Sequence, residues 1–131
     1  MHSFASMLPL LLFLCSVSTA AYVERAATTL GQASLLVSNG AVRECGTVIL
    51  NSDLSMTLPS ASWAGGSHCG HEVTVTYSVL KGGTVQSRSV QLKVAGECPV
   101  CIASQIEMTD AAFNSLGASE RGMPTVTWSL N

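Results

Sequence analysis

Three consecutive pieces near the carboxyl end carry most of the fold information: Gly96-Glu97-Cys98-Pro99-Val100-Cys101, Ile106-Glu107-Met108-Thr109-Asp110-Ala111-Ala112-Phe113 and Val126-Thr127-Trp128-Ser129. Two cysteines around a proline predict a tight turn in the first piece. In the second piece, Thr109 or Asp110 can cap a helix over residues 111–116, which Gly117 would end. Residues 125–130 alternate with period two, and this predicts a closing strand that buries Trp128.

Upstream of these pieces, two alternating runs flank the pair Gly82-Gly83, namely Glu72–Val79 and Ser87–Val94. Alternation on both sides of a Gly-Gly turn predicts a β-hairpin. One face of this hairpin should be buried, and its predicted members are Val73, Val75, Tyr77, Val90, Leu92 and Val94.

Further short strands are predicted at residues 33–37, 47–50 and 54–58, each followed by turn residues or proline. Ser60–Trp63 can form a helical turn that Ser60 would cap. Many short strands with one or two short helices and glycine-rich turns predict an all-β protein. This pattern fits a barrel and a sandwich equally well.

The amino-terminal segment has the features of a secretory signal peptide. Met7–Cys15 is apolar, and small residues stand at Ser18 and Ala20. The apolar run is shorter than the roughly 20 residues that a membrane span requires. We therefore predict a signal peptide at 1–20, a flexible leader at 21–30 and a single domain at 31–131, and we expect a secreted, extracellular protein without a membrane partner.

Charge and cysteine content indicate which partners and cross-links to expect. The 131 residues include 6 Lys and Arg and 8 Asp and Glu without a basic cluster, so we expect no nucleic-acid partner. Loss of Cys15 with the signal would leave Cys45, Cys69, Cys98 and Cys101, which predict two disulfides in any of three pairings. Zinc is the alternative, since Cys98 and Cys101 have ligand spacing and two histidines flank Cys69. Because exported cysteines are usually oxidised, we expect no metal. We also expect no cofactor and a monomeric protein.

Six segments in order resemble the secreted double-psi β-barrels, the group of expansin-like, barwin-like and rare-lipoprotein-A-like domains, in their fungal form. They are Gly31-x-Ala33-Ser34, Glu44-Cys45-Gly46, residues 51–58, Cys69–Tyr77, Cys98-Pro99-x-Cys101 and residues 106–113. The resemblance implies an all-β, six-stranded double-psi β-barrel with one or two short helices and two disulfides. It also implies the pairings Cys45–Cys69 and Cys98–Cys101.

The same resemblance implies a polar groove and its residues. Ser34 stands where the family has a threonine, Gly96 where it has a first aspartate, and Glu107 where it has a second. We add Asp53 and Trp63 to the candidate groove from the sequence itself, and we expect Trp63, which precedes a Gly/Ser-rich loop, to contact a sugar. The alternative roles are a solvated carboxylate near a helix start for Glu107 and a turn residue for Asp53.

This groove bears on catalysis. Glycoside hydrolysis by the paired mechanism needs two carboxyl groups about 5 to 9.5 Å apart. Since Gly96 removes one of them, we expect no catalytic residues and no enzyme. The first hypothesis is a binder or loosener of cell-wall polysaccharide. The second is a secreted effector or protease inhibitor that binds a secreted or host protein, which a flat apolar patch around Leu35 and Leu36 would favour. A glycan-cleaving enzyme comes third.

Overall fold

The computed structural model describes residues 27–119 and 122–131. The predicted signal peptide and residues 21–26 of the predicted leader lie outside the described residues. Thr29 and Leu30, which the sequence analysis assigned to the leader, already belong to the first strand. Within the described ranges, no helix has the length and apolar character needed to cross a membrane.

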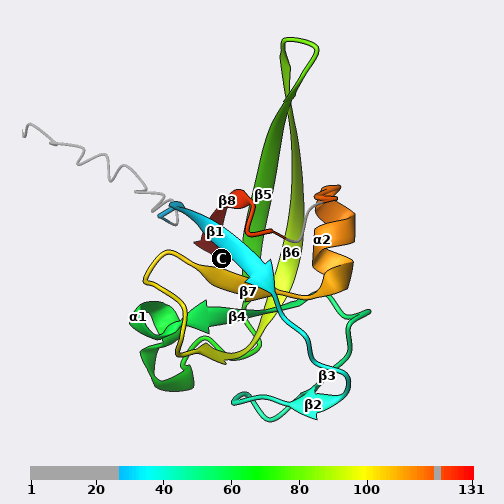
Figure 1. Ribbon diagram of the computed structural model, residues 1–131. Coiled ribbons are helices and arrows are strands. Elements are labelled where there is room, and N and C mark those ends of the chain that lie inside the picture. Colours follow the sequence, from blue (N-terminus) through cyan, green and yellow to red (C-terminus); the bar gives the residue numbers. More distant parts are fainter. Residues whose placement is uncertain (1–26, 120–121) are drawn as a thin grey trace, which may run out of the picture.

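Six strands form a closed barrel in the order β1-β7-β4-β6-β5-β8. Their bounds are β1 Thr29–Leu35, β4 Ser55–Pro59, β5 Glu72–Lys81, β6 Thr84–Cys98, β7 Ile106–Met108 and β8 Thr125–Leu130. The pairs β1–β7 and β4–β6 are parallel, and the other neighbours are antiparallel. The barrel is therefore confirmed and the sandwich is excluded (Figure 1).

The hairpin β5–β6 and its turn are confirmed. Lys81 pairs with Thr84, so Gly82 and Gly83 form the turn, with φ of 58° and 80°. A two-residue turn with positive φ at both positions matches the right-handed twist of the flanking strands. The tip of the hairpin projects well beyond the barrel (Figure 1). β6 runs past its predicted end at Val94 because its second half pairs with β4.

The barrel interior is filled by the predicted apolar faces. Val73, Val75, Leu92 and Val94 are buried, while Tyr77 and Val90 pack partly buried against them. Helix α2, Asp110–Leu116, adds Ala112, Phe113 and Leu116 to the same core and ends at Gly117, whose φ is 69°. Trp128 is buried as expected, and its indole Nε1 donates to the carbonyl oxygen of Ser104 at 2.9 Å.

Smaller elements lie at one end of the barrel, away from the hairpin tip (Figure 1). They are helix α1, Ser60–Trp63, the 3₁₀ turn η1, Ala64–Gly66, and a ribbon of β2, Ala41–Val42, with β3, Val48–Ile49. The sequence analysis missed β2. In this ribbon Ile49 points inward and forms a second small core with Leu36 and Ala95. Leu36 is only 2% exposed, so it does not belong to an apolar surface patch of the kind that would have favoured a protein-binding function.

Both disulfides have the pairing that the resemblance implied. Cys45 is bonded to Cys69 and Cys98 to Cys101. The first joins the segment after β2 to the turn before β5, and the second closes the turn after β6. Disulfides in a small domain are typical of exported proteins, which matches an oxidising compartment.

Candidate functional site

A row of registered residues crosses four strands on the outside of the barrel. Ser34 on β1 pairs with Glu107 on β7, Glu107 pairs with Thr57 on β4, and Thr57 pairs with Gly96 on β6. Residues 106 and 108, on either side of Glu107, point into the core. Because neighbouring side chains on a strand point to opposite faces, Glu107 points away from the core. The fold thus brings Ser34, Glu107 and Gly96 together, as the resemblance implied.

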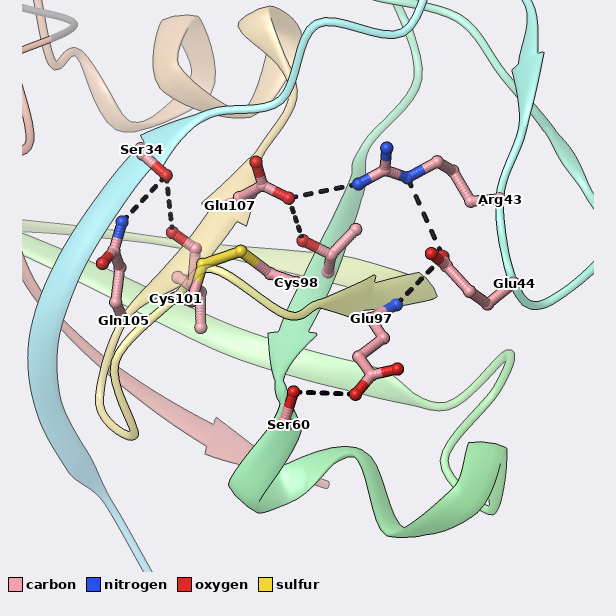
Figure 2. The surroundings of a disulfide bond; sticks show 11 residues. Ser34, Arg43, Glu44, Ser60, Glu97, Cys98, Cys101, Gln105 and Glu107 are labelled. Carbon is pink, nitrogen blue, oxygen red and sulfur yellow. Dashed lines mark hydrogen bonds and ion pairs between the residues drawn. A yellow bond between two sulfur atoms is a disulfide. The ribbon is translucent and has the colours of Figure 1, made fainter.

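Glu107 is the centre of this row. Its Oε1 accepts a hydrogen bond from the Thr57 hydroxyl at 2.7 Å and another from Arg43 Nη2 at 3.2 Å (Figure 2). The Glu107 side chain is 19% exposed and that of Arg43 is 28% exposed. A half-buried ion pair with a second hydroxyl donor is held more firmly than a surface pair. Glu107 therefore acts first as a structural acceptor.

The place of a side chain at Gly96 is taken by the segment after β2. A Cβ on Gly96 would lie 2.2 Å from Glu44 Oε2 and 2.9 Å from Arg43 Cβ. Glu44 Oε2 also accepts from the backbone N–H of Glu97 at 3.1 Å and lies 3.8 Å from Arg43 Nε. The disulfide at Cys45 fixes this segment. Arg43 and Glu44 therefore cover the Gly96 end of the row.

The other end of the row is also engaged in the protein's own contacts. The Ser34 hydroxyl donates to the carbonyl oxygen of Ile106 at 3.4 Å and accepts from Gln105 Nε2 at 3.2 Å. Glu97 projects away from the row, and its Oε1 accepts from the Ser60 hydroxyl at 2.7 Å (Figure 2). Ser60 consequently does not cap α1, whose N-cap residue is Pro59.

The remaining candidates have contacts of another kind. Asp53 Oδ2 accepts from the backbone N–H of Leu50 at 2.8 Å, and its carbonyl oxygen accepts from the Thr109 hydroxyl. These are the contacts of a turn residue. Trp63 lies in α1, is half-buried and packs against the main core.

One cluster has the composition of a metal site. Ligand atoms of Cys98, Cys101 and Glu107 lie within 4.8 Å of one another. Both sulfur atoms belong to one disulfide, however, so neither is a thiolate. This arrangement does not supply the ligands that zinc needs.

The surface of the described ranges carries exposed apolar side chains but no exposed Phe, Trp or Tyr ring. Its large exposed hydrophobic side chains are all aliphatic, and they are Leu30, Val37, Val42, Val48, Leu50, Leu54, Leu80, Val85, Val100, Ile102 and Met123. The Phe, Trp and Tyr residues of these ranges are buried or half-buried. Val100 is 89% exposed and Ile102 is 64% exposed, and both lie beside the Cys98–Cys101 disulfide.

Sequence reasoning missed Thr57, a member of the row, and Arg43 and Glu44, which cover its Gly96 end. The one available signal was the charged pair directly before Cys45, a cysteine expected to form a disulfide. Thr57 carried no signal, since its role follows from the registers of β4 with β6 and β7.

No family model matches this chain, and no curated protein matches it. Solved structures do. The Streptomyces papain inhibitor is 26% identical, with a TM-score of 0.62 over 79% of this chain and 94% of its own. A mutant of the Clavibacter michiganensis expansin in complex with cellohexaose is 20% identical, with a TM-score of 0.64 over 80% of this chain. The apo form of that expansin is 22% identical, with a TM-score of 0.60 over 80%.

The solved structures differ in how much of their own length this chain covers. This chain spans 50% of each expansin chain, and identities of 20% and 22% establish the fold alone. It spans nearly all of the papain inhibitor. None of these structures bears on the fungal subgroup. The closed barrel of two parallel and four antiparallel pairings and the likeness to these structures give one conclusion: this chain has the double-psi β-barrel fold that the expansin and the papain inhibitor share.

Proposed function

We propose that this chain is a secreted, non-catalytic protein that binds and inhibits a cysteine protease. The observation that carries the proposal is the exposed surface, where aliphatic side chains stand without exposed aromatic rings in the described ranges. Aliphatic side chains, like aromatic ones, can anchor an interface by filling a pocket of a protein partner. Sugar rings are held best by flat aromatic surfaces, so this surface favours the second hypothesis of the sequence analysis over the first.

The filled row supports the same choice. Arg43 and Glu44 occupy the space beside Gly96, and Glu107 Oε1 already accepts two hydrogen bonds. A polysaccharide would have to displace these contacts to reach the strands beneath. The likeness to the Streptomyces papain inhibitor over 94% of that chain adds a precedent for this barrel as an inhibitor.

The test is an inhibition assay with the mature protein, residues 21–131. We expect dose-dependent loss of papain activity on a peptide substrate, with trypsin as the control for a serine protease. Full papain activity in a large molar excess of this protein would refute the proposal. If papain is inhibited, steady-state kinetics at several substrate concentrations show whether the protein competes with the substrate for the cleft.

Absence of catalysis has its own test. The purified protein should release no soluble sugar from cellulose or chitin and no fragment from peptidoglycan. Glu107 is the candidate acid of the row, and its Oε1 is engaged by Thr57 and Arg43. Release of product that the substitution Glu107→Gln abolishes would overturn the non-catalytic assignment.

Polysaccharide binding is the second candidate function. It is favoured by one observation: Ser34 on β1 and Glu107 on β7 lie side by side and are both partly exposed. Sedimentation with chitin, cellulose and peptidoglycan, beside a bead control, tests it. Retention on one polymer that Glu107→Gln removes would favour this function.

A further inference from the structure

We infer that the loop Cys98–Ile102, which we name the inhibitory loop, enters the substrate cleft of the protease with Val100 as its anchor. The inference rests on the proposed function and adds the surface and the mode of binding. Val100 is 89% exposed, the highest value among the large exposed hydrophobic side chains of the described residues. An apolar side chain that projects so far fits a concave, apolar pocket.

The composition of the loop suits such a cleft. Residues 98–106 read Cys-Pro-Val-Cys-Ile-Ala-Ser-Gln-Ile and contain no charged side chain. Burying this segment therefore leaves no unpaired charge in the interface. Ile102, at 64% exposure, gives a second apolar contact two residues further on.

The loop is held in one shape before binding. The Cys98–Cys101 disulfide closes it, the backbone N–H of Cys101 donates to the Cys98 carbonyl oxygen at 3.2 Å, and that of Gln105 donates to Ile102 at 3.0 Å. Pro99 fixes its own φ. A loop that is already ordered loses little conformational entropy on binding, so more of its contact energy appears as affinity.

The disulfide also explains how such a loop would inhibit the enzyme without becoming a substrate. If the protease hydrolysed a peptide bond between Cys98 and Cys101, water would add across that bond. The new carboxylate and amine would stay joined through the Sγ–Sγ bond. Neither end could diffuse away, so the cleft would remain occupied and resynthesis of the bond would compete with release.

The other exposed aliphatic groups are less suited to this role. Leu80 and Val85 face each other across the tip of the hairpin β5–β6, next to Lys81 and the Gly-Gly turn. Glycines leave that tip with more conformational freedom to lose. Val42 and Val48 pair on the two-residue ribbon β2–β3 and are less exposed than Val100, at 60% and 58%.

The experiment compares the wild type with Val100→Asp and Val85→Asp in papain inhibition. Both substitutions place a charge on an exposed valine, at 89% and 67% exposure. We expect Val100→Asp to raise the inhibition constant by about tenfold or more, and Val85→Asp to change it by less than about threefold. Circular dichroism and the melting temperature check that both variants fold.

The outcomes separate the two proposals. If the wild type does not inhibit papain, the proposed function and the inference both fail. If the wild type inhibits and Val100→Asp inhibits equally well, or Val85→Asp is the variant that weakens inhibition, the loop is not the contact although the function stands. Hydrogen exchange of the wild type bound to papain gives a readout without substitution: protection concentrated in the inhibitory loop supports the inference, and protection elsewhere overturns it.

Discussion

The indole Nε1 of Trp128 donates a hydrogen bond of 2.9 Å to the carbonyl oxygen of Ser104. The same oxygen lies 1.8 Å from the point that a Cβ on Gly31 would occupy. The carbonyl oxygen of Ser104 therefore contacts both β8, through Trp128, and β1, at Gly31. This contact satisfies the polar atom of a buried tryptophan and holds the chain just beyond the inhibitory loop in place.

Gly31→Ala should destabilise the protein. The added methyl would collide with a backbone oxygen, which cannot move without loss of its bond to Trp128. We expect the free energy of unfolding to fall by about 2–3 kcal/mol, as measured by urea denaturation.

Gly122→Ala is the matched control for that change. A Cβ on Gly122 meets nothing within 4 Å, and its φ is not in the left-handed region. Its effect should stay within about 0.5 kcal/mol. Equal losses for the two variants would contradict the close approach of Gly31 and Ser104.

Thr57→Val should remove one of the two donors to Glu107. Thr57 is fully buried, and its hydroxyl lies 2.7 Å from Glu107 Oε1. We expect a loss of about 1–2 kcal/mol in the free energy of unfolding, since the valine has the shape but not the donor. Thr125→Val, on an exposed strand position of β8, should change it by less than about 0.5 kcal/mol. A neutral Thr57→Val would show that Glu107 does not depend on this bond.

Gly96→Asp should conflict with Glu44. The new side chain would occupy the space of the Glu44 carboxylate and add a second negative charge there. We expect a loss of about 1–3 kcal/mol. The double variant Gly96→Asp/Glu44→Ala should recover part of that loss, because space and charge are both relieved. A double-mutant cycle measured by thermal unfolding decides this, and strictly additive effects would count against the contact.

The two disulfides should differ in what they stabilise. Cys45–Cys69 spans a separation of 24 residues and Cys98–Cys101 a separation of 3. The longer loop restricts the unfolded chain more, so replacing Cys45 and Cys69 by alanine should cost about 3–4 kcal/mol and replacing Cys98 and Cys101 about 2 kcal/mol. Protease inhibition, measured well below the melting temperatures, should be weakened more by replacing Cys98 and Cys101 than by replacing Cys45 and Cys69. The reverse result in either assay would contradict the roles assigned here.

The local elements of this barrel were determined by the sequence alone. Period-two runs and the pair Gly82-Gly83 predicted the hairpin, and Gly117 predicted the end of α2, because strand alternation and positive φ are properties of consecutive residues. β2 was missed because its two residues do not belong to a longer apolar run, whereas the two residues of β3 lie within the predicted run 47–50. The choice of barrel over sandwich came from the family resemblance.

Caps and groove contacts were decided only by the tertiary structure. Thr109 is the N-cap residue of α2, yet its hydroxyl donates to the carbonyl oxygen of Asp53, a contact between residues 56 apart. Glu107 meets Thr57 across 50 residues and Arg43 across 64, and Glu44 meets the N–H of Glu97 across 53. Patterns of consecutive residues cannot predict contacts between residues so far apart in the sequence. They arise when the barrel closes, with β4 and β7 antiparallel, and when a disulfide-anchored segment fills the space that Gly96 leaves open.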